Sequence, residues 1–200
     1  MLSEIQRSAL VGFHGYYGND YVESFLRKTK KVWEKVRCDE ESLQFFKNLG
    51  IVQLDDDLFS ASEKFVCKLY GDNRYTSVNK LRCKMFWNHY RKKGKVPDLS
   101  LLPPCASSLR KHTSRAYFVA KIWKHAHIPV QNTGSFTDHG WFADGSIDWI
   151  DEAYPKNVDD LFEESAPATE DPSGQELNVD EDDGLDDASD IENEDDDEQL

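Results

Sequence analysis

Hydrophobic residues recur at three- and four-residue spacings along much of this chain, and this pattern predicts a mainly helical fold. The clearest helix is expected to begin at Ser107 or Ser108, which can cap it, and to reach about His125. Its apolar stripe consists of Leu109, His112, Ala116, Val119, Ala120 and Trp123. Its bases are expected on the other faces: Arg110, Lys111, Arg115, Lys121 and Lys124.

Three further amphipathic helices are predicted from the same spacing and from turn residues at their ends. The first covers residues 39–48 and stops before Gly50. The second follows the three acids at 55–57 and ends at Gly71, and the third begins at Thr76 or Ser77. Three adjacent acids could also suit a metal ion, but capping and the helix dipole favour the structural interpretation.

The stretch near the N-terminus combines glycines, aromatic residues and bases. Residues 14–20 predict a loop, because two glycines together with Asn and Asp favour turns. Residues 21–37 then indicate a strongly basic helix, with a possible interruption near Thr29. Either Asn19 or Asp20 is placed to cap that helix.

The spacing of the hydrophobic residues changes after about residue 130, where two short apolar segments flank a turn sequence. Residues 140–143 and 146–150 are separated by Asp144 and Gly145, which tolerate the positive φ of a two-residue hairpin turn. We therefore expect a small β-hairpin carrying two tryptophans. Such a hairpin requires packing against the helices to be stable.

Charge divides the chain into two parts. Residues 159–200 hold 20 of the 38 acids and no base, whereas residues 1–158 hold all 24 bases and 18 acids, a net charge of +6. Low hydrophobicity and high charge predict disorder from about residue 165. We therefore expect a basic helical domain over residues 1–155 and a disordered acidic tail over residues 156–200. A basic body suits a polyanion such as nucleic acid, although an ordinary solvated surface has the same charge.

The remaining composition points to an intracellular protein, nuclear or cytoplasmic. The four cysteines form no Cys-x-x-Cys pair, and no apolar run approaches the roughly 20 residues that span a bilayer. Neither secretion nor membrane insertion is expected. The histidines at 89, 125, 127 and 139 lack the spacing of a familiar zinc site, and no metal site is predicted from them.

Several motifs occur in an order that resembles a known group. Gly18-Asn19-Asp20-Tyr21 and the bases that follow resemble the segment of flap endonucleases and other PIN-like nucleases in which Gly-x-Asp-Tyr leads into a DNA-binding motif. More closely, residues 9 to about 151 resemble uncharacterised transposon-associated animal proteins. The shared features are His14 with Asp20, the Lys-rich stretch to Trp33, Leu102-Pro103-Pro104, Arg115-Ala116-Tyr117 with Trp123, and Gly140-Trp141.

The resemblance implies a metal-dependent nuclease site in which Asp20 is one of several carboxylates. Two divalent ions need such a cluster to stabilise the attacking and leaving oxygens of a phosphodiester. Only nineteen residues precede Asp20, so Mg²⁺ is expected only if a missing N-terminal part supplies the other ligands. The chain is then either the C-terminal piece of a longer product or a remnant without activity. No other cofactor is expected.

Two functions follow. The preferred one is a transposon-derived, nuclease-like protein that associates with nucleic acid and has no activity on its own. Its binding residues are expected to be Arg27, Lys28, Lys30, Lys31, Lys35, Arg91, Lys92 and Lys93. The alternative is a protein-interaction module whose acidic tail binds basic proteins.

Overall fold

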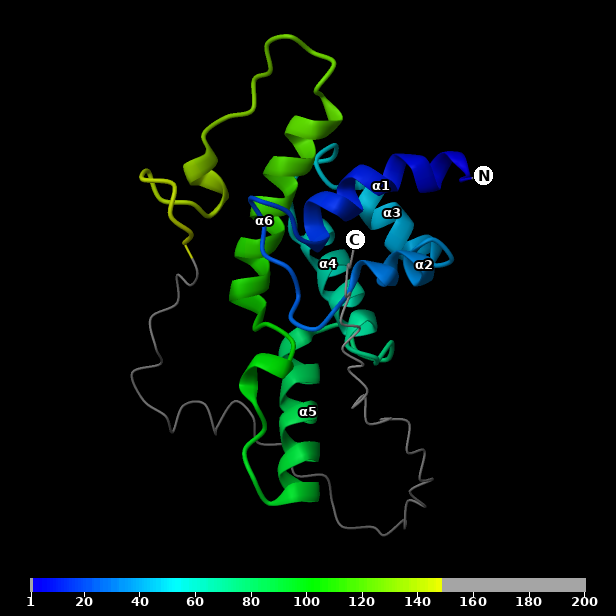
Figure 1. The fold of residues 1–200 in the computed structure, drawn as a ribbon, viewed down its shortest axis with the longest axis vertical. Helices are drawn as coiled ribbons and strands as arrows, with labels where there is room; N and C mark the ends of the chain where they lie inside the picture. The colour runs from blue at the N-terminus through cyan, green and yellow to red at the C-terminus, as the bar shows by residue number, and fades with distance from the viewer. Residues whose placement is uncertain (1, 149–200) are drawn as a thin grey trace, which may run out of the picture. The chain divides into compact units, whose positions relative to one another are not determined.

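The computed structural model describes residues 2–148 of this 200-residue chain. This part contains six α-helices and three 3-10 helices, with no strand assigned in it, so the mainly helical prediction is confirmed (Figure 1). The α-helices are α1 (Glu4–Tyr17), α2 (Trp33–Val36), α3 (Glu40–Asn48), α4 (Asp56–Leu69), α5 (Val78–Lys93) and α6 (Ala106–Lys124). The 3-10 helices are η1 (Lys30–Val32), η2 (Leu99–Leu101) and η3 (Phe136–His139). The predicted acidic tail lies outside the described residues.

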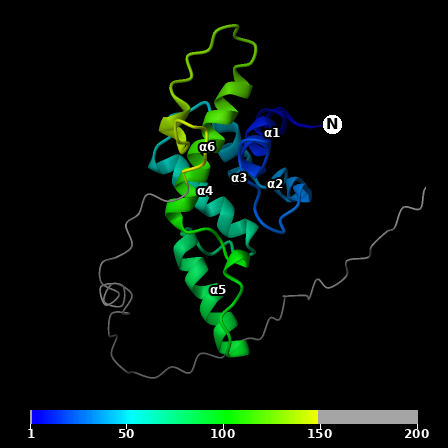
Figure 2. The ribbon, with the colours of Figure 1, turned by 60° about the vertical axis from the view of Figure 1, so that its left-hand side comes forward.

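The helices form a packed group from which one member extends. α1 packs against α3 and α6, and α4 packs against α3 and α6 as well. α5 packs against α4 and continues away from α1 and α3 in both views (Figure 1, Figure 2). Within residues 2–148, no helix has the length and apolar composition that a membrane span requires.

Helix ends in the middle of the chain lie where capping residues predict them. Asp39 accepts a hydrogen bond from the backbone N–H of Ser42 at 3.3 Å, and Asp55 accepts one from Leu58 at 2.9 Å. Both carboxylates cap the helices that follow, which confirms the structural interpretation of the acids at 55–57. The N-cap of α5 is Ser77, as predicted, but α6 begins earlier than predicted, because its N-cap is Cys105 and not Ser107 or Ser108.

The predicted loop over residues 14–20 is wrong in its first half, because α1 continues to Tyr17 and the loop begins only at Gly18. Burial of aromatic side chains at helical spacing outweighs the turn preference of the glycines. The aromatic residues that α1 buries are Phe13, Tyr16 and Tyr17. The glycine-rich sequence therefore belongs to a core helix.

The two glycines inside α1 allow close helix packing. A Cβ atom at Gly12 would lie 2.0 Å from the backbone oxygen of Phe46 on α3, a separation that no side chain tolerates. A Cβ atom at Gly15 would lie 3.5 Å from that of Ala120 on α6, which is ordinary van der Waals contact. Only the first glycine is required by the approach of a neighbouring backbone.

The basic helix predicted over residues 21–37 is wrong in its first part, where residues 21–29 form no helix, whereas the helical residues begin directly after the predicted interruption near Thr29. Regular structure in this stretch is limited to η1 and the four-residue α2. Asn19 accepts a hydrogen bond from the backbone N–H of Tyr21 at 2.9 Å, so its side chain closes a turn where a helix would have begun. Asp20, which was predicted as a possible cap, therefore precedes no helix.

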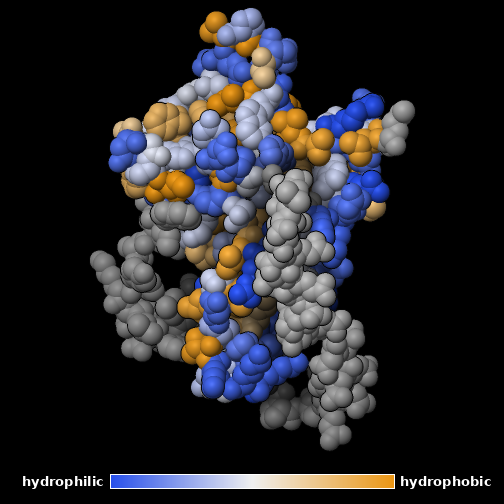
Figure 3. All heavy atoms as spheres, in the orientation of Figure 1, coloured by the Kyte–Doolittle hydropathy of each residue, from blue (hydrophilic) through white to orange (hydrophobic). Residues whose placement is uncertain are grey.

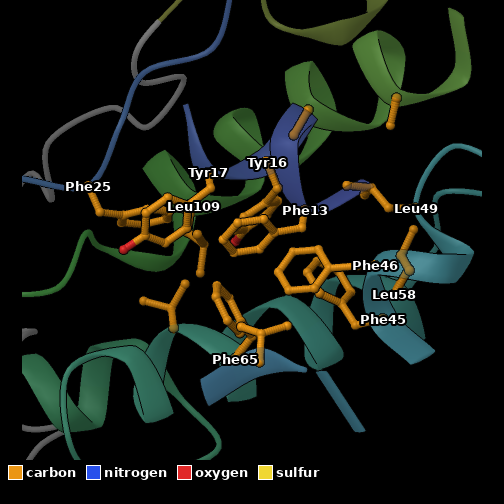
Figure 4. Packing of buried hydrophobic residues seen from close by; sticks show 14 of the residues in the cluster. Phe13, Tyr16, Tyr17, Phe25, Phe45, Phe46, Leu49, Leu58, Phe65 and Leu109 are labelled. Carbon is orange, nitrogen blue, oxygen red and sulfur yellow. The ribbon is translucent and has the colours of Figure 1, made fainter. Parts of the chain in front are cut away.

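Aromatic rings from three helices meet at Tyr16, which is fully buried (Figure 4). Its ring centroid lies 5.3 Å from that of Phe45, and 5.7 Å from those of Phe46 and Phe65. Its hydroxyl shares a 2.7 Å hydrogen bond with Ser62, which in turn lies 2.8 Å from Thr113. Edge-to-face pairs of this kind add about 0.5–1.5 kcal/mol each beyond area burial.

The predicted hairpin is represented by a single antiparallel bridge between Trp141 and Ile147. The backbone N–H of Phe142 donates to the carbonyl of Ser146 at 2.8 Å, which closes the intervening turn. Residues 149 and 150, the end of the second predicted strand, lie outside the described residues. The two-stranded hairpin therefore stays a prediction.

Candidate nucleic-acid interface

α5 and the segment that leads from it to α6, residues 78–105, are called the α5 arm below. The helix buries only Val78 and Leu81, both near its N-terminal end. The later turns of α5 therefore contribute little to the core, although they carry large aromatic side chains. A surface of this composition is available for binding.

Three aromatic side chains cluster on the exposed part of α5. The rings of Phe86 and Tyr90 are stacked with centroids 6.3 Å apart, and Trp87 meets Tyr90 edge-on at 5.9 Å. Trp87 is 47% exposed and Tyr90 is 43% exposed. In the part of the molecule where α5 lies, hydrophobic and hydrophilic residues alternate over the surface (Figure 3). Arg91, Lys92 and Lys93 directly follow Tyr90 on the helix, so the aromatic cluster is next to charged residues.

The charged residues of α5 itself are all bases, and Asp98, the one acid of the α5 arm, follows the helix. Between residues 73 and 97 there are eight Lys and Arg and no acid. The exposed bases beyond the aromatic cluster are Arg91, Lys92, Lys93 and Lys95. Among residues 2–148, no carboxylate pairs with Arg91, Lys93 or Lys95. The end of the arm is therefore a positively charged surface.

Two bases nearer the body have structural partners instead. Arg82 donates to the carbonyl oxygen of Pro103, which holds the returning segment against α5. Lys84 pairs with Asp72 at 2.8 Å, and its ammonium lies 5.0 Å from the ring centroid of Tyr75. These contacts fix the base of the arm and leave its far end for a ligand.

The second predicted group of bases, residues 27–35, belongs to the chain segment that connects α1 to α3. Arg27 is exposed in the loop with a φ of 56°, and Lys31 and Lys35 are exposed on η1 and α2. Lys28 lies over the ring of Tyr70, with its ammonium 4.5 Å from the centroid. Burial and then the charge of Lys35 lower the pKa of Lys28. Lys30 is the first residue of η1.

The two basic groups belong to different segments of the chain, although the charge of Arg27 acts on Asp98 of the α5 arm. At 1.5 Å per residue, Lys93 lies roughly 18 Å along α5 from Leu81, its last buried residue. The group at 27–35 belongs to a different segment, whose Lys28 packs on the residue that follows α4. Of the two, only the α5 arm combines exposed bases with exposed, mutually stacked rings.

Asp20, the predicted catalytic residue, is exposed in the loop that follows α1. Among residues 2–148, no group of three or more His, Cys, Asp or Glu side chains is arranged to hold a metal ion. The carboxylates expected from the nuclease resemblance are thus not gathered around Asp20 in the described part of the chain. Its catalytic role stays a prediction.

A buried ionic cluster, which the sequence did not predict, joins the loop after α1 to α6. Arg115 is 1% exposed and donates to Glu23 at 3.2 Å and to the carbonyls of Gly140 and Asp148 at 3.2 and 3.1 Å. His112 lies 3.6 Å from the same carboxylate. Burial raises the pKa of Glu23, but hydrogen bonding from His112 and the charge of Arg115 outweigh it and lower the pKa to about 2.

The expectation that Arg115 lies on an outer face of its helix is wrong. It follows His112 by three residues and precedes Val119 by four, so it falls on the buried stripe of α6. Its spacing was a sufficient signal for burial, but its charge suggested exposure. Partners far apart in sequence satisfy that charge, which is what burial of a guanidinium requires.

The chain was also compared with known proteins. No protein-family model, no curated protein and no solved structure matches it. Its function is therefore argued from the residues and geometry described above.

Proposed function

We propose that this chain binds nucleic acid through the far end of the α5 arm. One observation carries the proposal: α5 extends from the other helices and has both exposed aromatic rings and several bases. The helix contains no acid that would balance their positive charge. Lys and Arg gain affinity for phosphates by releasing condensed counterions. The aromatic rings add a second contact that phosphate binding alone does not use.

Unpaired bases are the form of nucleic acid that this surface suits. Stacking of a nucleobase on an aromatic side chain contributes about 1–3 kcal/mol, and it requires a base that is out of a duplex. Trp87 and Tyr90 present ring surface to solvent, whereas Asn88 is the one amide side chain next to them on α5 that could read a base edge. We therefore expect weak sequence preference and binding to single strands over duplexes.

The salt dependence of the affinity should reflect the number of bases that contact phosphates. With four phosphate contacts, from Arg91, Lys92, Lys93 and Lys95, the slope of log affinity against log salt is about −2.8 for a single strand. Affinity then falls about 50-fold between 50 and 200 mM salt. Fluorescence anisotropy with a labelled single-stranded oligonucleotide measures this slope directly.

A charge-reversal pair locates the interface. The double variant Arg91→Glu/Lys93→Glu should lose most of the binding, because both residues are exposed at the end of α5. The control Arg7→Glu/Lys47→Glu changes the net charge equally at exposed positions on α1 and α3. Equal loss in both doubles would show that only net charge matters and would contradict an interface on the arm.

Three further proposals follow from the resemblance and are independent of binding by the arm. They are kinship with transposon-associated PIN-like proteins, a remnant catalytic position at Asp20, and a tryptophan hairpin over residues 140–150. Binding by the arm requires none of them. Metal-dependent cleavage by this chain that disappears in Asp20→Ala would support a nuclease activity in addition to binding.

A second candidate function is interaction with basic proteins through the acidic tail. It is favoured by one observation, the 20 acids and absence of bases in residues 159–200. Binding of a poly-lysine peptide to the full chain, and its loss on removal of residues 165–200, would support this function. Retention of peptide binding after the deletion would contradict it.

A further inference from the structure

An apolar cavity of about 360 Å³ lies between α6 and the segment that contains η3 and the Trp141–Ile147 bridge. It is remote in sequence from the α5 arm, and the nucleic-acid proposal does not use it. Five of its lining residues are aromatic, namely Tyr21, Phe118, Trp123, Phe136 and Trp141. Its size is at the lower end of the range for small-ligand sites.

Three of the rings that line this cavity are held in place by contacts with other rings. Trp123 stacks on His14 of α1, with centroids 5.3 Å apart and planes inclined by 21°. Trp141 packs against Phe118 at 5.8 Å, and the other side of Phe118 meets His139 at 4.9 Å. Walls fixed by neighbouring rings reduce the ordering cost of binding a ligand. Tyr21, which is 61% exposed, is the one ring of the five that is open to solvent on most of its surface.

Charged residues of both signs adjoin the lining residues in sequence. Lys121 and Lys124 flank Ile122 and Trp123, and the ammonium of Lys124 donates to backbone carbonyls of residues 46, 47 and 49. No Lys or Arg is among the described residues that line it. Asp20 directly precedes the lining residue Tyr21, and Asp144 directly precedes the lining residue Gly145. The carboxylate of Asp144 is fixed by hydrogen bonds from the backbone N–H and hydroxyl of Ser146, at 2.9 and 2.6 Å. A cation in the cavity would therefore be surrounded by aromatic side chains, and an acid directly precedes two of the lining residues in the sequence.

The geometry points to a binding site for a quaternary ammonium group. Aromatic rings attract such a cation through their quadrupoles, and its methyl groups need no hydrogen bonds from the walls. A nucleobase fits less well, because its donors and acceptors would be left unpaired against an apolar lining. A purely apolar ligand would fill the space but would gain nothing from the ring quadrupoles.

The test compares a cation with its neutral carbon isostere. Choline and 3,3-dimethylbutan-1-ol have the same shape, so apolar burial is matched and only the positive charge differs. Isothermal titration of the full chain should give choline at least about tenfold higher affinity, as expected for a desolvated cation–π site. Equal affinity for the two ligands would overturn the inference.

Variants assign the binding to this cavity. Tyr21→Ala should weaken choline binding severalfold without affecting folding, since most of this side chain is outside the core. Trp141→Phe keeps an aromatic ring but weakens the cation–π attraction, and it should have an intermediate affinity. The control is Trp87→Ala on the α5 arm, which should bind choline like the wild type. If Trp87→Ala loses binding and Tyr21→Ala does not, the site is elsewhere.

Two sources can present this chemistry, a free small molecule or a methylated lysine of a protein. A peptide carrying one trimethyl-lysine is therefore titrated beside choline and beside the unmethylated peptide. Preference for the methylated peptide over choline identifies a protein ligand, and the reverse identifies a small one. Either result supports the site, whereas equal binding of the methylated and unmethylated peptides together with no choline binding contradicts it.

Discussion

α1 and α5 contain similar residues but use them differently. Both helices carry three aromatic side chains, and they are 14 and 16 residues long, although α1 has one Lys or Arg and α5 has six. α1 places its rings against α3 and α6 and buries Tyr16 completely, whereas α5 buries none of its three aromatic side chains. The comparison shows that aromatic content alone does not distinguish a core helix from a binding helix. What distinguishes them is whether neighbouring elements cover the rings.

The largest expected effect tests this difference by truncating one ring from each environment. Phe46 is fully buried against α1, so Phe46→Ala should lower the free energy of unfolding by about 3–5 kcal/mol. Trp87→Ala on α5 should change it by about 0.5 kcal/mol or less. Urea unfolding followed by circular dichroism measures both. Similar losses would mean that α5 is covered as α1 is.

A smaller effect concerns the glycines that let α1 approach its neighbours. Gly12→Ala should destabilise the protein by about 1–3 kcal/mol, because its Cβ would lie 2.0 Å from the oxygen of Phe46. Gly15→Ala is the matched control on the same helix, where the new Cβ meets only ordinary contacts. It should stabilise by up to about 1 kcal/mol through helix propensity. The same sign for both changes would contradict the packing described for α1.

Acid should weaken the ionic cluster that attaches the loop after α1 to α6. The pKa of Glu23 is about 2 in the folded chain, below its ordinary value of 4.5. Its stabilising contribution is therefore fully present above pH 4.5 and is lost as the pH falls towards about 2. Urea midpoints across this window should fall more steeply for the wild type than for Glu23→Gln.

The comparison with Glu23→Gln also removes the contribution of other acids. Hydrogen bonds from Arg74 and Lys84 lower the pKa of Asp72, which therefore titrates in both proteins and cancels in the difference. Parallel pH profiles for the wild type and Glu23→Gln would show that the carboxylate of Glu23 contributes nothing to the pH dependence of folding.

The smallest effect concerns the arm and the acidic tail. If the tail competes with nucleic acid for the bases of α5, deletion of residues 165–200 should tighten oligonucleotide binding on the order of tenfold at low salt. The gain should vanish at high salt, where the charges are screened. Anisotropy titrations of both chains at two salt concentrations measure this effect, and unchanged affinity at low salt contradicts competition.

Local signals were sufficient to predict the middle of the fold. The acids at 39 and 55 cap α3 and α4, the stripe on α6 is buried as its spacing indicates, and α5 begins at its predicted Ser77. These features depend on residues a few positions apart, so sequence periodicity and capping chemistry are sufficient to predict them. The starting residue of α6 differs from the predicted one by about two positions.

The remaining features depend on partners distant in sequence. The loop predicted over residues 14–20 did not anticipate that α1 runs to Tyr17, and the need for a glycine at position 12 is set by the backbone of Phe46 on another helix. Arg115 was expected to be exposed, but carbonyls of residues 140 and 148 and the carboxylate of Glu23 satisfy it. The exposure of the rings on α5 could not be predicted either, because the sequence does not show which helices are left uncovered by neighbouring elements.

The contacts of Arg115 also have a consequence for how the molecule opens. One guanidinium holds the loop after α1 through Glu23 and the segment near the Trp141 bridge through two backbone carbonyls. Release of either segment leaves the buried charge with fewer partners, which makes release of the other easier. Hydrogen exchange should therefore show these two segments, far apart in the chain, unfolding locally as one cooperative unit.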